Sequence, residues 1–136
     1  MKNAINAIEF SHGPCHTEVR LTKEGPKIVE INPRLGGRFI SKMIEDSIGI
    51  NPIKEVIKLA MGEQLELSRK PSTGSAWCAI TSPKTGILKN ILGTEKVLSS
   101  LGVEVLTINA KVGNRIKKPT NNGDAIGYIY NWEKLS

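Results

Sequence analysis

Apolar residues recur with two different periods in the first quarter of the chain, and each period predicts a different element. Residues 2–10 place apolar side chains three and four positions apart, which is the spacing of one helix face. Residues 15–22 and 27–32 alternate apolar and polar side chains, as strands with two different faces do. The letters KEGP between them are a turn signal, so the two strands are predicted to form a hairpin.

Two helices are predicted after the hairpin. Residues 38–48 carry apolar side chains at helical spacing. Residues 52–61 follow Asn51, a favourable N-cap, and begin with Pro52 at the first helical position. Gly62 stands just beyond the end of this second helix, where glycine commonly ends helices. Both helices are expected to pack their apolar stripe onto a core.

A polar, turn-rich segment at residues 67–75 is predicted to be a linker between two domains. Beyond it, short apolar runs alternate with turns and predict strands, with one short helix near residues 94–101. The predicted fold class is α+β. An antiparallel sheet with packed helices is expected over residues 1–66, followed by a small β-rich lobe over residues 76–136.

Composition and charge restrict the class of protein. The 136 residues are 39% hydrophobic and 24% charged, an ordinary globular balance. The net charge of +6 suits a phosphate-handling surface, but the basic residues are scattered and aromatics make up 4%, so nucleic-acid binding is not expected. Two distant cysteines form neither a disulfide framework nor a cysteine-only zinc site. The sequence shows no signal peptide and no membrane-spanning apolar run, so no membrane contact and a cytoplasmic location are expected.

Polar side chains gather on one face of the predicted hairpin. If the turn centres on Glu24, Glu18 pairs with Glu30 and His16 pairs with Asn32. Like charges directly opposite each other are unfavourable unless something offsets them. Ile28 is expected on this same face, and the opposite, buried face is expected to consist of Val19, Leu21, Val29 and Ile31.

Two interpretations of this acidic face stay open. Arg20, on the same face, could offset part of the repulsion, and a divalent cation would do so better. Two carboxylates and the amide oxygen of Asn32 are hard ligands suited to Mg²⁺ or Mn²⁺, and Arg34 follows one step beyond as a contact for a phosphate. The alternative is that Glu18 and Glu30 are simply solvated surface charges.

The stretch GPCHTEVRLTKEGPKIVEINPRLGG resembles the end of the ATP-grasp fold, in the branch of L-amino-acid ligases, carbamoyl-phosphate synthases and biotin carboxylases. The resemblance lies in a glutamate on one strand and a Glu-x-Asn-x-Arg on the next, twelve residues on. It implies that Glu18, Glu30 and Asn32 hold the magnesium ions that bridge the phosphates of ATP. It also implies that Arg34 contacts the acyl-phosphate or carboxylate.

The second half of the chain resembles the small C-terminal domain of L-amino-acid ligases. The resemblance rests on ITSPKTGILKNILG and GVEVLTINAKVGNRIKKPTNNGDAIGYIY, and in all it covers residues 11–131. Gly113, Gly123 and Gly127 are expected to supply turns or a close backbone approach. Residues 76–136 show no combination of acid, base and nucleophile, so no catalysis is expected from them.

The resemblance implies the C-terminal part of an ATP-dependent carboxylate–amine ligase that uses ATP and Mg²⁺ or Mn²⁺. The N-terminal ATP-grasp half would then come from elsewhere, whether this chain is a fragment, a split subunit or a remnant, and the chain alone is not expected to turn over ATP. A homodimer stays open. The alternative function is a non-catalytic binding or assembly module. Asn32 favours the ligase, because a surface that serves only solubility needs no amide between an acid and an arginine.

Overall fold

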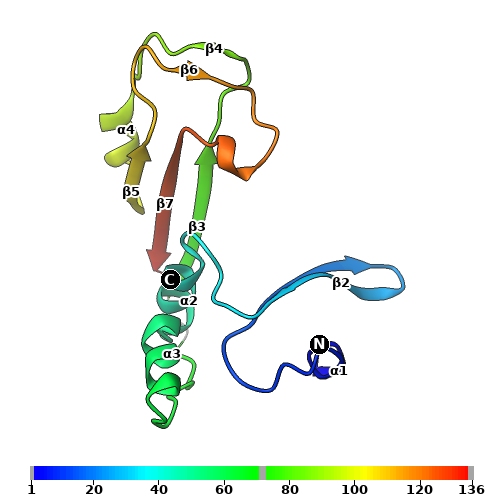
Figure 1. The fold of residues 1–136 in the computed structure, drawn as a ribbon. Helices are drawn as coiled ribbons and strands as arrows, with labels where there is room; N and C mark the ends of the chain where they lie inside the picture. Colours follow the sequence, from blue (N-terminus) through cyan, green and yellow to red (C-terminus); the bar gives the residue numbers. More distant parts are fainter. Residues whose placement is uncertain (1, 71–72, 135–136) are drawn as a thin grey trace. The chain divides into compact units, whose positions relative to one another are not determined.

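The computed structural model describes residues 2–70 and 73–134, and the chain divides into two compact units, Met1–Pro71 and Ser72–Ser136 (Figure 1). The predicted linker at residues 67–75 includes the start of a strand at Thr73. Both units combine antiparallel strands with helices, so the predicted fold class is confirmed. No helix within residues 2–70 and 73–134 has the length and apolar character needed to cross a membrane.

The first unit contains the predicted hairpin and helices. Its elements are α1 (Lys2–Ala7), β1 (His16–Thr22), β2 (Gly25–Asn32), α2 (Ile40–Ile48) and α3 (Pro52–Ala60). Helix α2 ends at Gly49, which takes the left-handed conformation (φ 70°) that glycine adopts without steric cost. Helix α3 begins as predicted, because the Asn51 side chain accepts a hydrogen bond from the Lys54 backbone N–H at 2.9 Å.

The apolar face of the hairpin is exposed, and the prediction that it is buried is wrong. Leu21 is 84% exposed and Val29 is 62% exposed, and Val19 is also exposed, whereas Ile31 is half-buried. A two-stranded sheet has no second layer of its own, and neither α2 nor α3 covers this face. The hairpin therefore presents unburied apolar surface.

Helix α3 is likewise less buried than its apolar stripe predicts. Ile53 and Ile57 are each more than half exposed, and Met61, just beyond the helix, is more exposed still. The buried side chain of α3 is instead a charged one, Glu55. Its carboxylate accepts a hydrogen bond from the Glu66 backbone N–H at 2.7 Å and lies 3.2 Å from the Lys58 ammonium group, which fastens the following segment to the helix.

The second unit is a small β-rich lobe. Its elements are β3 (Thr73–Ile80), β4 (Gly86–Ile87), α4 (Thr94–Leu98), β5 (Val103–Ile108), β6 (Arg115–Ile116), a 3₁₀ turn (Asn122–Asp124) and β7 (Gly127–Lys134). Strand β7 lies between β3 and β5 in an antiparallel sheet, and β4 pairs with β6 in a second, two-stranded sheet.

The core of this unit lies along its central strand. Tyr130 of β7 is fully buried, and Ile116 of β6 is also buried. Gly127, the first residue of β7, lies so close to the Thr107 carbonyl of β5 that a Cβ atom there would overlap it. The predicted close backbone approach at Gly127 is therefore confirmed.

Candidate functional site

The two acids predicted to share one face of the hairpin do share it. Glu18 of β1 pairs directly with Glu30 of β2, and paired residues of an antiparallel ladder point to the same side. Both side chains are exposed, with 54% of the Glu18 side chain accessible. Two carboxylates held opposite each other repel unless a cation lies beside them.

A β-bulge next to this pair is what brings the acids onto one face. The turn has two residues rather than three, because Thr22 pairs with Gly25. An unbroken ladder from that pair would place Val29 opposite Glu18 and would turn Glu30 to the other face. The register shift beside Glu18 adds one residue to β2, and the acids again lie opposite each other.

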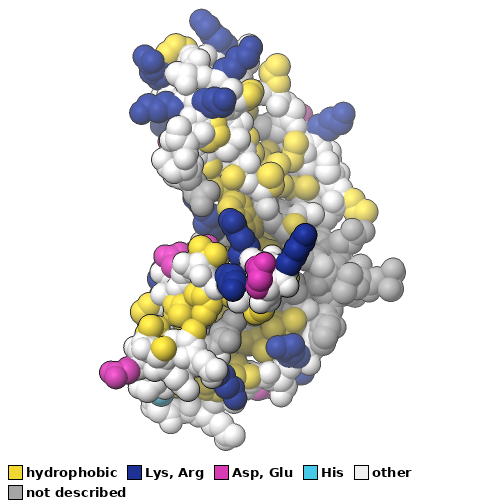
Figure 2. Space-filling model, turned by 90° about the vertical axis from the view of Figure 1, so that its right-hand side faces the viewer, with side chains coloured by type: hydrophobic (Ala, Val, Ile, Leu, Met, Phe, Trp, Pro, Cys, Tyr) yellow, Lys and Arg dark blue, Asp and Glu magenta, His cyan; other side chains and the backbone are white. Residues whose placement is uncertain are grey.

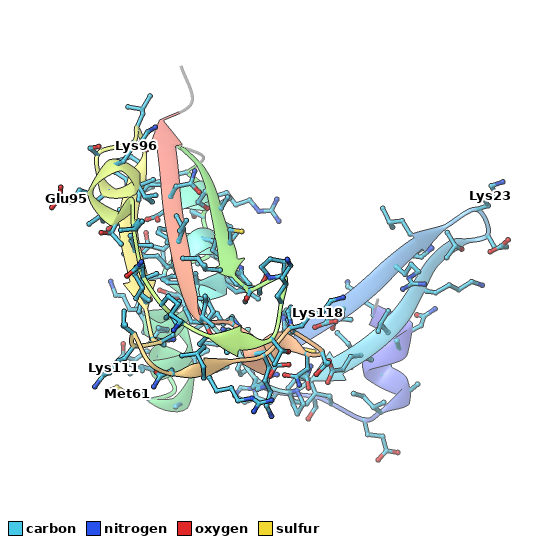
Figure 3. All side chains as sticks on the ribbon, turned by 90° about the horizontal axis from the view of Figure 1, so that it is seen from above. Lys23, Met61, Glu95, Lys96, Lys111 and Lys118 are labelled. Carbon is cyan, nitrogen blue, oxygen red and sulfur yellow. The ribbon has the colours of Figure 1, made fainter. Side chains whose placement is uncertain are left out.

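The bulge also changes which residues accompany the acids. Ile28 pairs with Val19 and so lies on the apolar face, whereas the sequence predicted it on the acidic face. Lys27 pairs with Arg20 and so joins the acidic face, where sequence reasoning expected Arg20 alone. Two basic residues therefore stand next to the acid pair on the side of the turn, whose end is marked by Lys23 in Figure 3.

Asn32 pairs with His16 at the other end of the same face. The His16 Nε2 atom lies 3.7 Å from a Glu18 carboxylate oxygen. The Asn32 Nδ2 atom is buried and has no hydrogen-bond partner among the residues that the structure describes. The oxygen and nitrogen of an amide can exchange places by a simple flip, so either atom can occupy this buried position.

Arg34 lies in the exposed loop that follows β2. Pro33 cannot continue the ladder, and the Arg34 backbone N–H donates instead to the Asn32 carbonyl at 2.8 Å. One guanidinium nitrogen donates to the Leu35 carbonyl at 2.8 Å. A guanidinium group has five N–H donors, so most of them remain available to an anion.

The loop from Arg34 to α2 is tightly constructed. A Cβ atom at Gly36 would lie 2.7 Å from the Ile40 side chain, so this position requires glycine. Arg38 has a positive φ of 55°, an unusual conformation for a non-glycine residue and one that often marks functional loops. The sequence gives no sign of this conformation at Arg38, because the type of a residue does not determine its backbone angle.

The candidate donors on the hairpin are of the types that a hard divalent cation accepts, but they are few. No three side chains of His, Cys, Asp and Glu within residues 2–70 and 73–134 gather closely enough to hold a metal ion by themselves. The predicted set contains two carboxylates and one amide, all oxygen ligands of the kind that Mg²⁺ accepts. Mg²⁺ usually completes its coordination with water and phosphate oxygens. A magnesium site therefore commonly has only a few protein ligands.

Comparison with known proteins shows which ligases this chain resembles. The model of the family "L-amino acid ligase C-terminal domain 2" matches residues 79–131. The crystal structure of an L-amino acid ligase from Bacillus licheniformis superposes with a TM-score of 0.81 and 25% sequence identity, over 97% of this chain and 34% of that one. The chain is similar to the C-terminal part of ATP-grasp ligases. The predicted resemblance is therefore confirmed.

Two proteins are similar to this chain in sequence over most of its length. The uncharacterized protein y4rH of Sinorhizobium fredii is 30% identical over 129 residues, which make up 95% of this chain and 27% of that protein. The L-arginine-specific L-amino acid ligase of Bacillus subtilis is 30% identical over 109 residues, which make up 77% of this chain and 26% of that protein. This chain therefore spans between 26% and 34% of the length of these two proteins and of the Bacillus licheniformis ligase.

Proposed function

We propose that this chain supplies the metal-binding side chains and an anion-binding arginine of an ATP-dependent carboxylate–amine ligase. The observation that carries the proposal is the direct pairing of Glu18 with Glu30 on one face, beside the buried, partnerless amide of Asn32. A solvated surface has no need to hold two acids against each other or to bury an amide without a partner.

Each residue has a separate part in the proposed site. Glu18, Glu30 and Asn32 would hold Mg²⁺ or Mn²⁺, which when bound offsets the negative charge of the ATP phosphates. Arg34 would direct its remaining N–H donors at the acyl-phosphate or the substrate carboxylate. Arg20 and Lys27, on the same face, would add positive charge toward the hairpin turn.

The rest of the ligase would have to come from outside these residues. The lysines that clamp the ATP phosphates and the pocket for adenine are expected in the N-terminal region of such an enzyme, working in the cytoplasm. We assign residues 1–66 to the end of the ATP-grasp domain, residues 67–75 to a linker and residues 76–136 to the small C-terminal domain. The family match over residues 79–131 supports the last of these assignments.

A second candidate is a non-catalytic binding or assembly module derived from the same fold. The exposed apolar face of the hairpin, with Leu21 and Val29, favours it, because such surface is typical of interaction sites. The two candidates differ in one property. A module without the ligase site has no reason to respond to a divalent metal through Glu18 and Glu30.

A thermal melt with and without millimolar Mn²⁺ tests the metal site. Mn²⁺ is expected to raise the melting temperature of the parent chain by mass action, because the ion binds only the folded hairpin. Glu18→Gln and Glu30→Gln should each abolish this increase. Either substitution should also raise the metal-free melting temperature, because it removes the repulsion between the acids.

Glu63→Gln is the matched control, since Glu63 is an exposed glutamate outside the hairpin. It should keep the full response to Mn²⁺. An equal response in the parent and in all three variants would show that the hairpin acids are only solvated surface, and it would leave the binding module as the better function.

A further inference from the structure

The small β4–β6 sheet and the loops beside it carry a strongly positive surface. We call residues 81–92 and 109–118 the basic lobe. These segments contain six basic residues and no Asp or Glu. The basic residues, all exposed, are Lys84, Lys89, Lys111, Arg115, Lys117 and Lys118. Figure 2 shows dark blue side chains gathered in the part of the second unit where Figure 1 places β4 and β6.

Hydrogen bonds between the two segments fix the spacing of these charges. The Leu88 backbone N–H donates to the Asn114 carbonyl at 2.9 Å, and the Gly113 N–H donates to the Leu88 carbonyl at 2.9 Å. The Lys118 backbone N–H donates to the Thr85 hydroxyl at 3.0 Å. In Figure 3, Lys111 and Lys118 mark the two ends of the segment that contains β6. The charges are therefore distributed along a defined surface rather than on a loose tail.

A nearby acid offsets this charge only in part. Hydrogen bonds from Thr120 are the main cause that lowers the pKa of the Asp124 carboxyl, and the charge of Lys117 lowers it to a smaller extent. Asp124, the acid that follows the lobe in sequence, accepts hydrogen bonds from the Thr120 N–H at 2.8 Å, the Thr120 hydroxyl at 3.0 Å and the Asn121 N–H at 3.3 Å. Its carboxylate is thus occupied in capping its own turn. In the part of the chain that the structure describes, none of the six basic side chains forms an ion pair with a carboxylate.

Exposed aliphatic side chains and a cavity lie among the charges. Ile87 is 53% exposed and Val112 is 61% exposed. A cavity of about 300 Å³ is lined by Ile87, with Lys84 and Lys89 also among its lining residues. A surface that combines cations, exposed aliphatic groups and a hollow is unlike an ordinary solvated face, which carries charges of both signs.

We infer that the basic lobe docks an acidic segment of another protein that also carries aliphatic side chains. Carboxylates of the partner would pair with the lysines, and its aliphatic side chains would cover Ile87 and Val112. This inference rests on the second unit alone and is independent of the hairpin chemistry.

Two other anionic partners fit the lobe less well. Residues 81–118 contain no Phe, Tyr or Trp on which nucleic-acid bases could stack, and exposed aliphatic groups gain nothing beside a phosphate backbone. A membrane surface is broad and smooth, whereas the cavity beside Ile87 suits a protruding side chain. RNA and anionic lipid are therefore the competing ligands in the experiment.

The experiment compares four probes on the full chain at low and physiological salt. The probes are a labelled peptide of glutamates with interspersed leucines, a peptide with serines in place of the leucines, a single-stranded RNA of equal charge, and vesicles of phosphatidylcholine and phosphatidylserine. Fluorescence anisotropy measures binding of the peptides and RNA, and co-sedimentation measures binding of the vesicles. The glutamate–leucine peptide is expected to bind most tightly and to keep measurable affinity at physiological salt.

Variants show whether binding occurs at the basic lobe. The double variant Lys84→Glu with Lys89→Glu should weaken binding of the glutamate–leucine peptide about tenfold or more, because it replaces attraction by repulsion at the cavity. Ile87→Ser should weaken that peptide but leave the glutamate–serine peptide unchanged. Lys2→Glu with Lys23→Glu makes the same change of net charge in the first unit and should alter binding less than about twofold.

Circular dichroism checks that each variant is folded. If the first double variant does not fold, Lys117→Glu with Lys118→Glu replaces it, since both side chains are exposed. Tighter binding of RNA or of vesicles than of the glutamate–leucine peptide would overturn the inference. Equal weakening by the lobe variant and by the control in the first unit would overturn it as well.

Discussion

At the scale of single residues, Asn32 is the most informative position of the proposed site. Its Nδ2 atom is buried and has no hydrogen-bond partner within residues 2–70 and 73–134, and a buried donor without a partner is unfavourable for the folded state. A residue that is unfavourable for stability and lies beside paired acids is typical of a binding site. A substitution at Asn32 should therefore change the stability of the metal-free chain and the binding of metal in opposite directions, so the two effects can be measured separately.

Asn32→Leu should stabilise the metal-free chain and remove its response to Mn²⁺. The expected gain in the free energy of unfolding is about 1 kcal/mol or more, because the substitution replaces an unsatisfied polar group by an apolar one of similar size. Urea denaturation with and without Mn²⁺ measures both quantities. A loss of stability in Asn32→Leu would mean that the amide does find partners, and it would remove the observation on which the site partly depends.

The pairing of the two hairpin acids could be predicted from the sequence, but the way in which the hairpin achieves it could not. The sequence predicts the Glu18–Glu30 pair from alternation around a turn centred on Glu24, whereas the structure reaches the same pair through a two-residue turn and a bulge. Ile28 and Lys27 were placed on the wrong faces, because a bulge depends on the conformation of the turn rather than on residue type. The burial of Asn32 depends on how the chain packs around it, which alternation does not encode.

At the scale of elements, the β1–β2 hairpin shows how one extra residue positions the acids. Val29 is the residue that β2 gains at the register shift. Removing it should leave Ile28 opposite Val19 and the acids opposite each other, now in an unbroken ladder. Deletion of Val29 is therefore expected to keep the Mn²⁺ response of the melting temperature. Deletion of Lys27 is the matched control; it should shift the pairs on the turn side of the acids and lower the melting temperature.

Helix α3 gives the second prediction at this scale. The Glu66 backbone N–H is the main cause that lowers the pKa of the Glu55 carboxyl below its ordinary value of 4.5, and Lys58 lowers it further. The ionised carboxylate is therefore favoured in the folded state. The resulting contribution to stability is fully present above the ordinary pKa and disappears as the pH falls through the lowered value.

Glu55→Gln should accordingly destabilise the chain at neutral pH and matter less in acid. Urea denaturation of the parent and the variant at about pH 7 and about pH 3 measures the difference. Glu63→Gln, at an exposed glutamate just beyond α3, serves as the control. A destabilisation by Glu55→Gln that is the same at both pH values would show that packing, rather than charge, accounts for the role of Glu55.

Helix α3 shows why the position of a helix is easier to predict from sequence than the burial of its side chains. The capping of α3 by Asn51 follows from local residue preferences, and the structure confirms it. The exposure of Ile53 and Ile57 does not follow from the same periodicity, because an apolar stripe shows which face would be buried and not whether anything covers it. The same holds for Leu21 on the hairpin.

At the scale of the whole molecule, the proposed chemistry needs more than this chain provides. Positioning of the reacting groups supplies most of the catalysis in phosphoryl transfer, and the groups expected to clamp ATP lie outside these residues. The chain is therefore expected to release no phosphate from ATP above background. Addition of the N-terminal region of a related L-amino acid ligase should restore release with the parent chain and not with Glu30→Gln.

Phosphate release is measured for the chain alone, for the added region alone and for the two together. Steady ATP hydrolysis by the pure chain, abolished by Glu30→Gln, would contradict this prediction and would mean that the chain contains the whole site. Restoration that survives Glu30→Gln would contradict the proposed role of the acids while leaving the similarity to L-amino acid ligases unaffected.

The bulge at Val29 also affects how relatives of this chain should be recognised in genomes. Here the two glutamates lie twelve positions apart because one residue of β2 lies outside the regular ladder. A relative with the same two-residue turn and a regular ladder would bring its glutamates together at a spacing of eleven. A search pattern that demands one fixed interval would divide a single structural family in two, whereas a pattern that allows either interval would keep it whole.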